Sequence, residues 1–332
     1  MSWVPLSGAC SSAPSATSPV DAGTVDAEGT DAGGVSGAPT IWLQPSSSID
    51  PTKLPLCDQC YTAVTAGGPP RKGFAYVCDA LAYEQKNAKG GIGGPWIDSA
   101  SHTYDVTRKP FWGGTVYWAQ AEVSIATSGD PRVITGNGLP VGVPTGTFPV
   151  SPSDPAFQYD RNPNAIAAQT LSFSIPGNPA VDPNGPHCTY KRIGITLDGI
   201  QLHGPIDSSG RDELAWEIQD ACSGDAQPGG AYHRHALGEC VPHIHEKNAL
   251  VGYALDGFGI FSPYDATGKE LTSADLDECH GITSAVPWQG QTVTLYHYVL
   301  TRDFPYTVTC FRGIPTRNAF PPLPGAPPEQ TY

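Results

Sequence analysis

The C-terminal half of the chain repeats itself, and this repeat constrains the fold more than any other feature of the sequence. Residues 193–210 read IGITLDGIQLHGPIDSSG and residues 251–268 read VGYALDGFGIFSPYDATG, with seven of the eighteen positions identical. In both segments Leu-Asp-Gly separates two apolar stretches, and Asp-Gly favours a tight turn between strands. We therefore expect two copies of one β-rich unit that share a core, with a site at the interface between them.

Two further pairs of motifs extend the repeat. Residues 220–224 (DACSG) match residues 277–281 (DECHG), and a Tyr-His pair at 232–233 matches another at 296–297. Each copy is thus expected to run as strand, turn, strand, turn, short helix, D-x-C-x-G motif and Tyr-His strand.

Glycine and proline limit the regular structure in the remainder of the chain. The 332 residues include 38 Gly and 34 Pro, a density that interrupts helices and suits short strands joined by turns. Strand-like patterns occur at residues 115–127, 132–135, 147–150 and 171–175, whereas residues 74–89 are the best helix candidate. The predicted fold class is mostly β, an α+β fold with few short helices, built from a duplicated unit and stapled by disulfides.

Nine cysteines indicate the compartment. Eight of them form an even set, which in a Gly/Pro-rich chain indicates a disulfide framework in an exported protein. For the C-x-x-C at residues 57–60 this favours a disulfide over a redox or zinc site. Each copy of the repeat has one cysteine before its Tyr-His strand and one after it, which predicts the bridges Cys222–Cys240 and Cys279–Cys310. The remaining cysteines should then pair among themselves: Cys57, Cys60, Cys78 and Cys188.

The composition also divides the chain into segments. Residues 1–10 (MSWVPLSGAC) resemble the end of a bacterial lipoprotein signal, which makes Cys10 a candidate lipid anchor. Residues 11–40 contain no aromatic and no basic side chain and predict a disordered tether. The expected parts that follow are a cysteine-bearing preface at 41–92, a main domain at 93–315 with the repeat at 193–240 and 251–313, and a Pro-rich tail at 316–332.

Charge and motifs exclude several classes of protein. The 18 Lys and Arg against 32 Asp and Glu give a formal net charge of -14, which disfavours a nucleic-acid partner. No apolar run is long enough for a transmembrane segment. The chain has no G-x-S-x-G, H-E-x-x-H, P-loop or G-x-G-x-x-G motif.

Two His-x-His pairs, 233/235 and 243/245, are the strongest chemical signal. In a strand, residues two apart point to the same face, so each pair could direct two imidazoles at one point. Imidazoles gathered in an exported protein suit copper first and zinc second. The candidate metal ligands are His233, His235, His243, His245 and His297, whereas His203 and His280 are weaker candidates at ordinary turn or helix positions. A carboxylate could orient a ligand imidazole through its other nitrogen, and the candidates for this role are Asp220, Asp277 and Glu246.

Other interpretations stay open from the residues alone. The Tyr-His alternation also fits a strand with packed tyrosines and with histidines hydrogen-bonded to neighbouring groups. The protein would then be a non-catalytic surface module that binds a glycan or a protein partner. A hydrolase based on two carboxylates is a third class, because such pairs leave no local signature.

Taken together, the motifs resemble those of the bacterial YHYH-domain proteins. They are YHRH (232–235), GYALDG (252–257), YHY (296–298), RDFPYT (302–307), CFRG (310–313), ITGNGLP (134–140), GTFP (146–149) and YDRNPN (159–164). The resemblance covers residues 94–315 and implies an exported bacterial protein that is secreted, periplasmic or held at the outer membrane as a lipoprotein. It implies little about a reaction.

The chain departs from the YHYH pattern in each copy. Arg234 stands where the first copy would have its second Tyr, and Val299 stands where the second copy would have its last His. We therefore expect the first copy to hold the richer half of any site.

Overall fold

The computed structural model describes residues 49–83, 91–236 and 238–317. The expected signal segment at 1–10 with Cys10, the tether at 11–40 and the tail from residue 318 onward lie outside the described residues. Among the described residues, no helix has the length and apolar character needed to cross a membrane.

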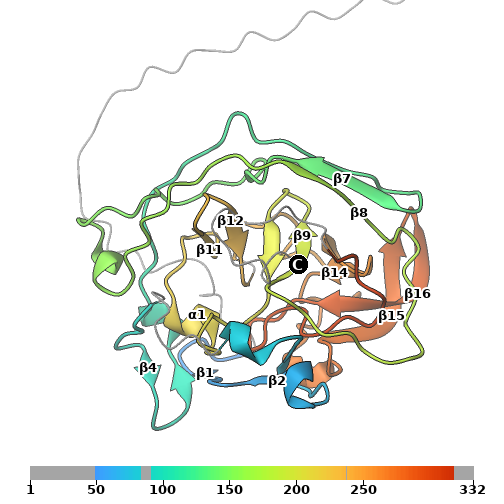
Figure 1. Cartoon of the computed structure of the whole chain (residues 1–332), viewed down its shortest axis with the longest axis horizontal. Coiled ribbons are helices and arrows are strands. Elements are labelled where there is room, and N and C mark those ends of the chain that lie inside the picture. The colour runs from blue at the N-terminus through green and yellow to red at the C-terminus, as the bar shows by residue number, and fades with distance from the viewer. Residues whose placement is uncertain (1–48, 84–90, 237, 318–332) are drawn as a thin grey trace, which may run out of the picture. The chain divides into compact units, whose positions relative to one another are not determined.

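An eight-stranded sheet contains both copies of the repeat (Figure 1). The first copy contributes β9 (Arg192–Thr196), β10 (Gln201–His203), β11 (Gly224–Ala226) and β12 (Tyr232–Arg234). The second contributes β13 (Leu250–Ala254), β14 (Gly259–Phe261), β15 (Gly281–Trp288) and β16 (Gln291–Val299). The strand order is β11-β12-β10-β9-β13-β14-β16-β15, so the two copies have the same internal order and meet through β9 and β13.

The pairing register is the same in both copies. In the first copy β10 runs parallel to β12 with Leu202 opposite Arg234, and in the second β14 runs parallel to β16 with Ile260 opposite Tyr298. These four residues occupy matching positions of the repeat. The duplication in the sequence is therefore a duplication of hydrogen-bonded architecture.

A glycine that is identical in both copies allows the central strands to approach. A Cβ on Gly194 would lie 2.5 Å from the carbonyl oxygen of Tyr253, and a Cβ on Gly252 would lie 2.6 Å from that of Ile195. Side chains cannot occupy such gaps, so both positions require glycine.

The two copies share one hydrophobic core, as the repeat predicts. Ile193, Ile195 and Leu202 of the first copy belong to one buried cluster with residues of the second copy such as Val251 and Ile260. A three-stranded antiparallel sheet packs into the same cluster; its strands are β6 (Val123–Ile125), β7 (Arg132–Gly136) and β8 (Leu171–Ile175).

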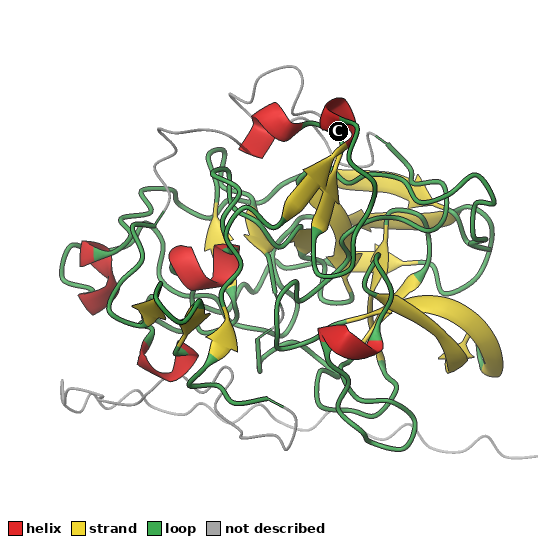
Figure 2. Ribbon diagram, turned by 90° about the horizontal axis from the view of Figure 1, so that it is seen from below, coloured by secondary structure: helices red, strands yellow, loops and turns green. Residues whose placement is uncertain are grey.

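The remaining elements are short. A three-stranded sheet has the order β1-β5-β4, and a two-stranded parallel sheet joins β2 and β3. These strands are β1 (Leu54–Pro55), β2 (Tyr61–Ala63), β3 (Ala75–Val77), β4 (Ile97–Asp98) and β5 (Thr103–Tyr104). The helices are single turns (Figure 2): α1 (Glu213–Trp216) and 3-10 turns at Val64–Ala66, Ala80–Tyr83, Val106–Arg108, Pro155–Gln158 and Ser273–Asp275. The predicted class, mostly β with few short helices, is confirmed.

Some predicted elements are wrong. Within residues 74–89, the segment Ala75–Val77 is a strand, and only Ala80–Tyr83 is helical before the described residues stop at 83. The Tyr76 amide donates to the carbonyl of Thr309, so pairing with distant backbone outweighs local helix propensity here. Residues 147–150 are not a strand, because Thr147 and Val150 instead bond to Gly113 and Asn162 in loops.

Four disulfides join the described cysteines. Both within-copy bridges, Cys222–Cys240 and Cys279–Cys310, are formed. The other four cysteines pair as Cys57–Cys60 and Cys78–Cys188. The second of these ties the preface to the main domain.

The bridges close loops of very different length, which predicts unequal contributions to stability. Cys78–Cys188 spans 110 residues and Cys57–Cys60 spans 3, for which loop-closure entropy gives about 5 and about 1.5 kcal/mol. We expect the double variant Cys78→Ala/Cys188→Ala to lose far more free energy of unfolding in urea than Cys57→Ala/Cys60→Ala. Equal losses would contradict a loop-entropy origin.

Candidate metal centre

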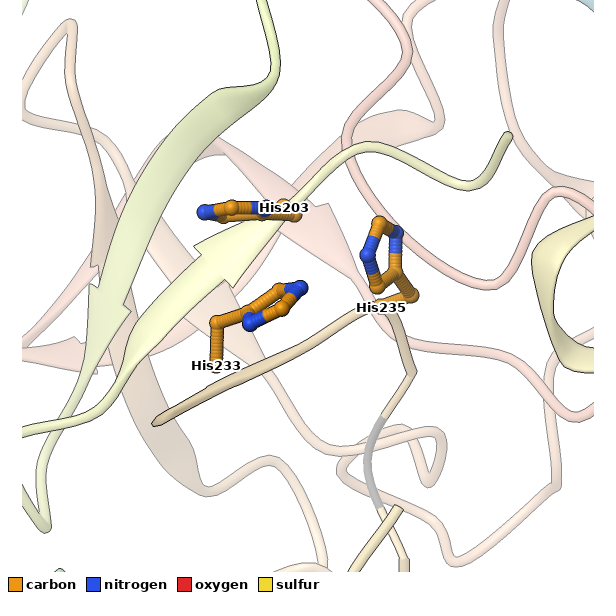
Figure 3. Close-up of side chains that lie close together, drawn as sticks. All are labelled: His203, His233 and His235. Carbon is orange, nitrogen blue, oxygen red and sulfur yellow. The ribbon is translucent and has the colours of Figure 1, made fainter. Parts of the chain in front are cut away.

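Three imidazoles converge inside the first copy of the repeat. His203 ends β10, His233 lies in β12 and His235 follows β12 by one residue. Because His233 and His235 are two apart on an extended strand, they share a face, and the neighbouring strand β10 presents His203 to them. The ring centroids are 4.1 Å apart for His203–His233, 5.0 Å for His233–His235 and 5.3 Å for His203–His235 (Figure 3).

The nitrogens of this cluster have the geometry of a ligand set. One nitrogen of each ring lies within 4.8 Å of the other two, and all three residues are buried. His203 Nε2 and His233 Nδ1 have no hydrogen-bond partner among the described residues. Buried polar atoms without partners are rare and destabilising, so these two nitrogens fit atoms that coordinate an ion.

The other ring nitrogens meet groups that can fix the imidazoles. His235 Nδ1 donates to the carbonyl of Gly204, so Nε2 carries the lone pair that can bind a metal. His233 Nε2 lies 3.2 Å from Oδ1 of Asp225, which comes from β11. A carbonyl or carboxylate on the non-coordinating nitrogen is the usual way that proteins orient a metal-binding histidine.

Glu213 places a second carboxylate beside the cluster. Its Oε1 lies 3.8 Å from Nε2 of His235, and it accepts a hydrogen bond from the Gln219 amide. Gln219 in turn accepts from the buried ammonium of Lys109 at 2.7 Å. Glu213, Asp225 and His235 also form a compact group that could hold an ion. The cluster therefore offers imidazole nitrogen on one side and carboxylate oxygen on the other.

Burial sets the charge of these groups. It lowers the pKa of His235 to about 4, and burial with repulsion between the rings holds the pKa of His203 and His233 well below the usual range. The imidazoles are thus neutral near pH 7, the form that binds metal. Burial and neighbouring acids, Glu217 first, raise the pKa of Glu213 and Asp225 well above their usual range. A cation would favour their ionised form.

The structure brings together only two of the five predicted ligands. His243 and His245 are wrong as members of this cluster, because residues 238–248 form turns and the strand alternation that justified the second pair is absent. His243 has a φ of 67°, and its side chain is 48% exposed and pairs with Glu246. The side chain of His245 is 52% exposed and pairs with Glu239.

His297 is also separate from the cluster. It lies in β16 at the position equivalent to His233, where it packs edge-on against Phe261 with centroids 4.9 Å apart. The cluster therefore lies within the first copy, and the expected position of the site between the two copies is wrong for it. The two copies meet where β9 pairs with β13. His203 is on β10, which is separated from β13 by β9.

Apolar side chains replace most of the cluster in the second copy. Phe261 and Val299 occupy the positions of His203 and His235, whereas Leu271 and Ile282 occupy those of Glu213 and Asp225. Only His297 remains polar. The four-stranded unit of the second copy folds with apolar side chains at four of these five positions. The unit therefore does not need the buried polar cluster in order to fold.

His203, Glu213 and Asp225 are the site residues that sequence reasoning missed or underrated. For His203 a signal existed, because the repeat pairs it with a phenylalanine at an otherwise matched position. Glu213 and Asp225 carry no local signature and come together only through the fold.

Two predicted orienting carboxylates act on tyrosines. Asp220 accepts a hydrogen bond from the Tyr232 hydroxyl at 2.8 Å, and Asp277 accepts one from Tyr296 at 3.1 Å. Because Tyr and His alternate along the strand, these aspartates lie on the face opposite the imidazoles. Their assignment to a ligand histidine is therefore wrong, and Glu246 bonds to His243 outside the cluster.

Arg234 has the structural role that a tyrosine has in the second copy. It lies between His233 and His235, points to the other face, and pairs with Asp198 of the Leu-Asp-Gly turn at 2.9 Å. At the equivalent positions the Tyr298 hydroxyl donates to Asp256 at 2.6 Å. The departure from YHYH thus preserves the contact between the strand and the turn.

This equivalence predicts a substitution that the fold should tolerate. Arg234→Leu leaves the carboxylate of Asp198 buried without its cationic partner, with only the Thr196 hydroxyl still bonded to it, which should cost about 3 to 5 kcal/mol. Arg234→Tyr restores a donor and should recover most of that loss. Urea unfolding of both variants measures the difference, and Tyr298→Leu is the matched control. Equal destabilisation by Leu and Tyr would exclude the equivalence.

His280, the other weak candidate, lies in the second copy and is a stability determinant. It is buried, its Nε2 lies 3.0 Å from the Thr301 hydroxyl, and burial lowers its pKa to about 3. As the pH falls below 6.5, the unfolded chain therefore protonates this histidine before the folded protein does. The stability that neutral His280 contributes is present above that pH and is lost below it. Between about pH 7 and pH 4.5 the loss should be about 2.5 kcal/mol.

The variant His280→Asn tests this directly, because Asn tolerates the positive φ of 68° at this position. Its free energy of unfolding should fall less over this pH range than that of the wild type. A parallel decline in both proteins would show that His280 does not contribute.

Comparison with known proteins matches one segment of the chain to a family model. A family model described as YHYH protein matches residues 172–273. Searches of the curated proteins and of the solved structures each found no match. The matched range contains the whole first copy, including the three clustered histidines and both carboxylates. Residues 172–273 therefore match the YHYH family, and the candidate metal centre lies inside the matched range.

Proposed function

We propose that this protein binds one transition-metal ion through His203, His233 and His235. The observation that carries the proposal is the contrast between the copies. At the positions where the second copy has Phe261 and Val299, the first copy has two buried imidazoles that meet a third. A shared frame with an added polar cluster supports a function that only the first copy performs.

The hydrogen bonds assign the ligand atoms. His203 Nε2 and His233 Nδ1 are the buried nitrogens without partners, and the bond to Gly204 leaves His235 Nε2. Glu213 is the nearest oxygen donor to that nitrogen and would complete the set as an N3O site, whereas Asp225 would orient His233.

The available donors favour copper(II) or zinc. All eight cysteines in the described residues are in disulfides, and the single methionine of the chain is Met1. A site without thiolate or thioether suits copper(II) and zinc better than copper(I). Because copper(II) binds such donors more tightly, we propose copper first and zinc second.

The surroundings of the cluster allow access to a small molecule. The three histidines line a cavity of about 480 Å³ together with Glu213 and Asp225. A bound ion would act there as a Lewis acid toward an oxygen of a molecule in the cavity. The neutral imidazoles and Glu213 would hold the ion.

Export is part of the proposal. Four disulfides, one of which joins segments 110 residues apart, are typical of an oxidising compartment. They support a secreted or periplasmic protein, or a lipoprotein at the outer membrane.

Metal content tests the proposal. Protein purified without a histidine tag and dialysed against copper or zinc should retain one ion per chain, as measured by elemental analysis. His203→Ala and His235→Ala should each weaken binding by about 100-fold or more, because each removes one of three nitrogen ligands. The matched controls are His243→Ala, at an exposed histidine, and His297→Gln, at the second-copy equivalent of His233; both should bind as the wild type does.

Two results would refute the metal site. One is a metal content below about a tenth of an ion per chain for both metals after dialysis. A site with the expected affinity would retain more. The other is an equal effect of His203→Ala and His243→Ala. Thermal melts of the metal-free variants check that each variant is folded.

A further inference from the structure

The wall of the cavity beside the three histidines restricts the ligands that fit it. A volume of about 480 Å³ lies within the range of small-molecule sites. Besides the histidines, the charged groups that line it are Asp160, Lys191, Asp207, Glu213, Glu217 and Asp225. The apolar lining is limited to Pro163, Ile206, Ala226 and Pro228. This composition does not suit an apolar ligand.

Carboxylates dominate the charge of the wall. Five of them face one lysine, and only Asp207 is paired with an arginine, Arg211, at 2.6 Å. A phosphate or carboxylate ligand would approach four further acidic groups. In the ionised form of these carboxylates, which a bound cation would favour, the wall disfavours anions.

Three of these carboxylates have acceptor capacity that the protein does not use. Asp225 is only 9% exposed, and each of its oxygens meets one donor: Oδ1 lies 3.2 Å from His233 Nε2, and Oδ2 accepts from the Asn162 amide, so each keeps a second lone pair. The Glu217 carboxylate accepts no hydrogen bond from the described residues, and Glu213 accepts one, from Gln219. A ligand that donates several hydrogen bonds would satisfy them.

The same cavity also contains donors that need an acceptor. Gln227 Nε2 is buried without a partner among the described residues, and Gln227 and Lys191 both line the cavity. An ammonium ligand only donates, and a phosphate mainly accepts, whereas a hydroxyl group does both. The pattern of unmet donors and acceptors thus matches a set of hydroxyl groups.

We propose that the cavity binds an uncharged polyhydroxyl molecule of monosaccharide size. Its hydroxyls would donate to Glu213, Glu217 and Asp225 and accept from Gln227 and Lys191. The inference rests on the proposed function only at the three histidines, where a bound metal ion would contact one further hydroxyl oxygen of the ligand. The wall contacts do not require the ion.

A matched series of probes tests the charge rule. Glucose, galactose, mannose and mannitol are compared with glucose 6-phosphate and glucosamine, which add a negative and a positive charge to one ring. Saturation-transfer NMR titrations would be run on metal-loaded and metal-free protein. We expect at least one neutral probe to bind with a millimolar Kd, and glucose 6-phosphate to bind more weakly than glucose.

Variants of the wall test the contacts. Glu217→Leu and Gln227→Leu should each weaken binding of the neutral probe by about tenfold, the effect of one lost hydrogen bond, with metal content unchanged. Glu246→Leu, at an exposed glutamate outside the cavity, is the control and should have no effect.

Several outcomes would overturn the inference. They are no binding by any neutral probe, tighter binding of either charged sugar than of all neutral ones, or unchanged affinity in both wall variants. Loss of sugar binding with metal retained refutes this inference alone. Sugar binding by a protein that takes up no metal refutes the metal site alone.

Discussion

A buried aspartate at each Leu-Asp-Gly turn holds the Tyr-His strand of its copy in place, and the site depends on this contact. Asp198 pairs with Arg234, and Asp256 accepts a hydrogen bond from Tyr298, with all four side chains almost fully buried. Away from water such bonds are strong, and an unpaired carboxylate would be costly. The contact fixes which residues of β12 face the turn. The residues on either side, His233 and His235, must then face the opposite way.

That separation of faces lets one frame serve two purposes. Along an extended strand one set of side chains anchors the fold, and the alternate set is free to vary. In the second copy, Leu271, Val299 and Ile282 from this alternate set pack in one apolar cluster, and Phe261 packs against His297. The first copy fills it with imidazoles and carboxylates, where burial keeps the imidazoles neutral. The divergence between the copies therefore leaves the anchoring contacts of the frame intact.

Much of the fold follows from the sequence, but only part of the site does. The repeat predicts two copies, a shared core and two within-copy disulfides, because the same motifs recur in the same order in both copies. The pair His233 and His235 follows from strand alternation. His243 and His245 have the same spacing but lie in turns, where residues two apart have no common face. Spacing is informative only where the backbone is extended.

By itself the sequence determined the class of fold, the duplication and one pair of histidines, since these depend on periodicity within single segments. The tertiary structure decided that His203, Glu213 and Asp225 join that pair, and that His297 does not. These residues lie on different strands and on a helix, and they meet because β12 pairs with β10 and β11. Which strands become neighbours is set by the packing of the whole core, and no local pattern records it.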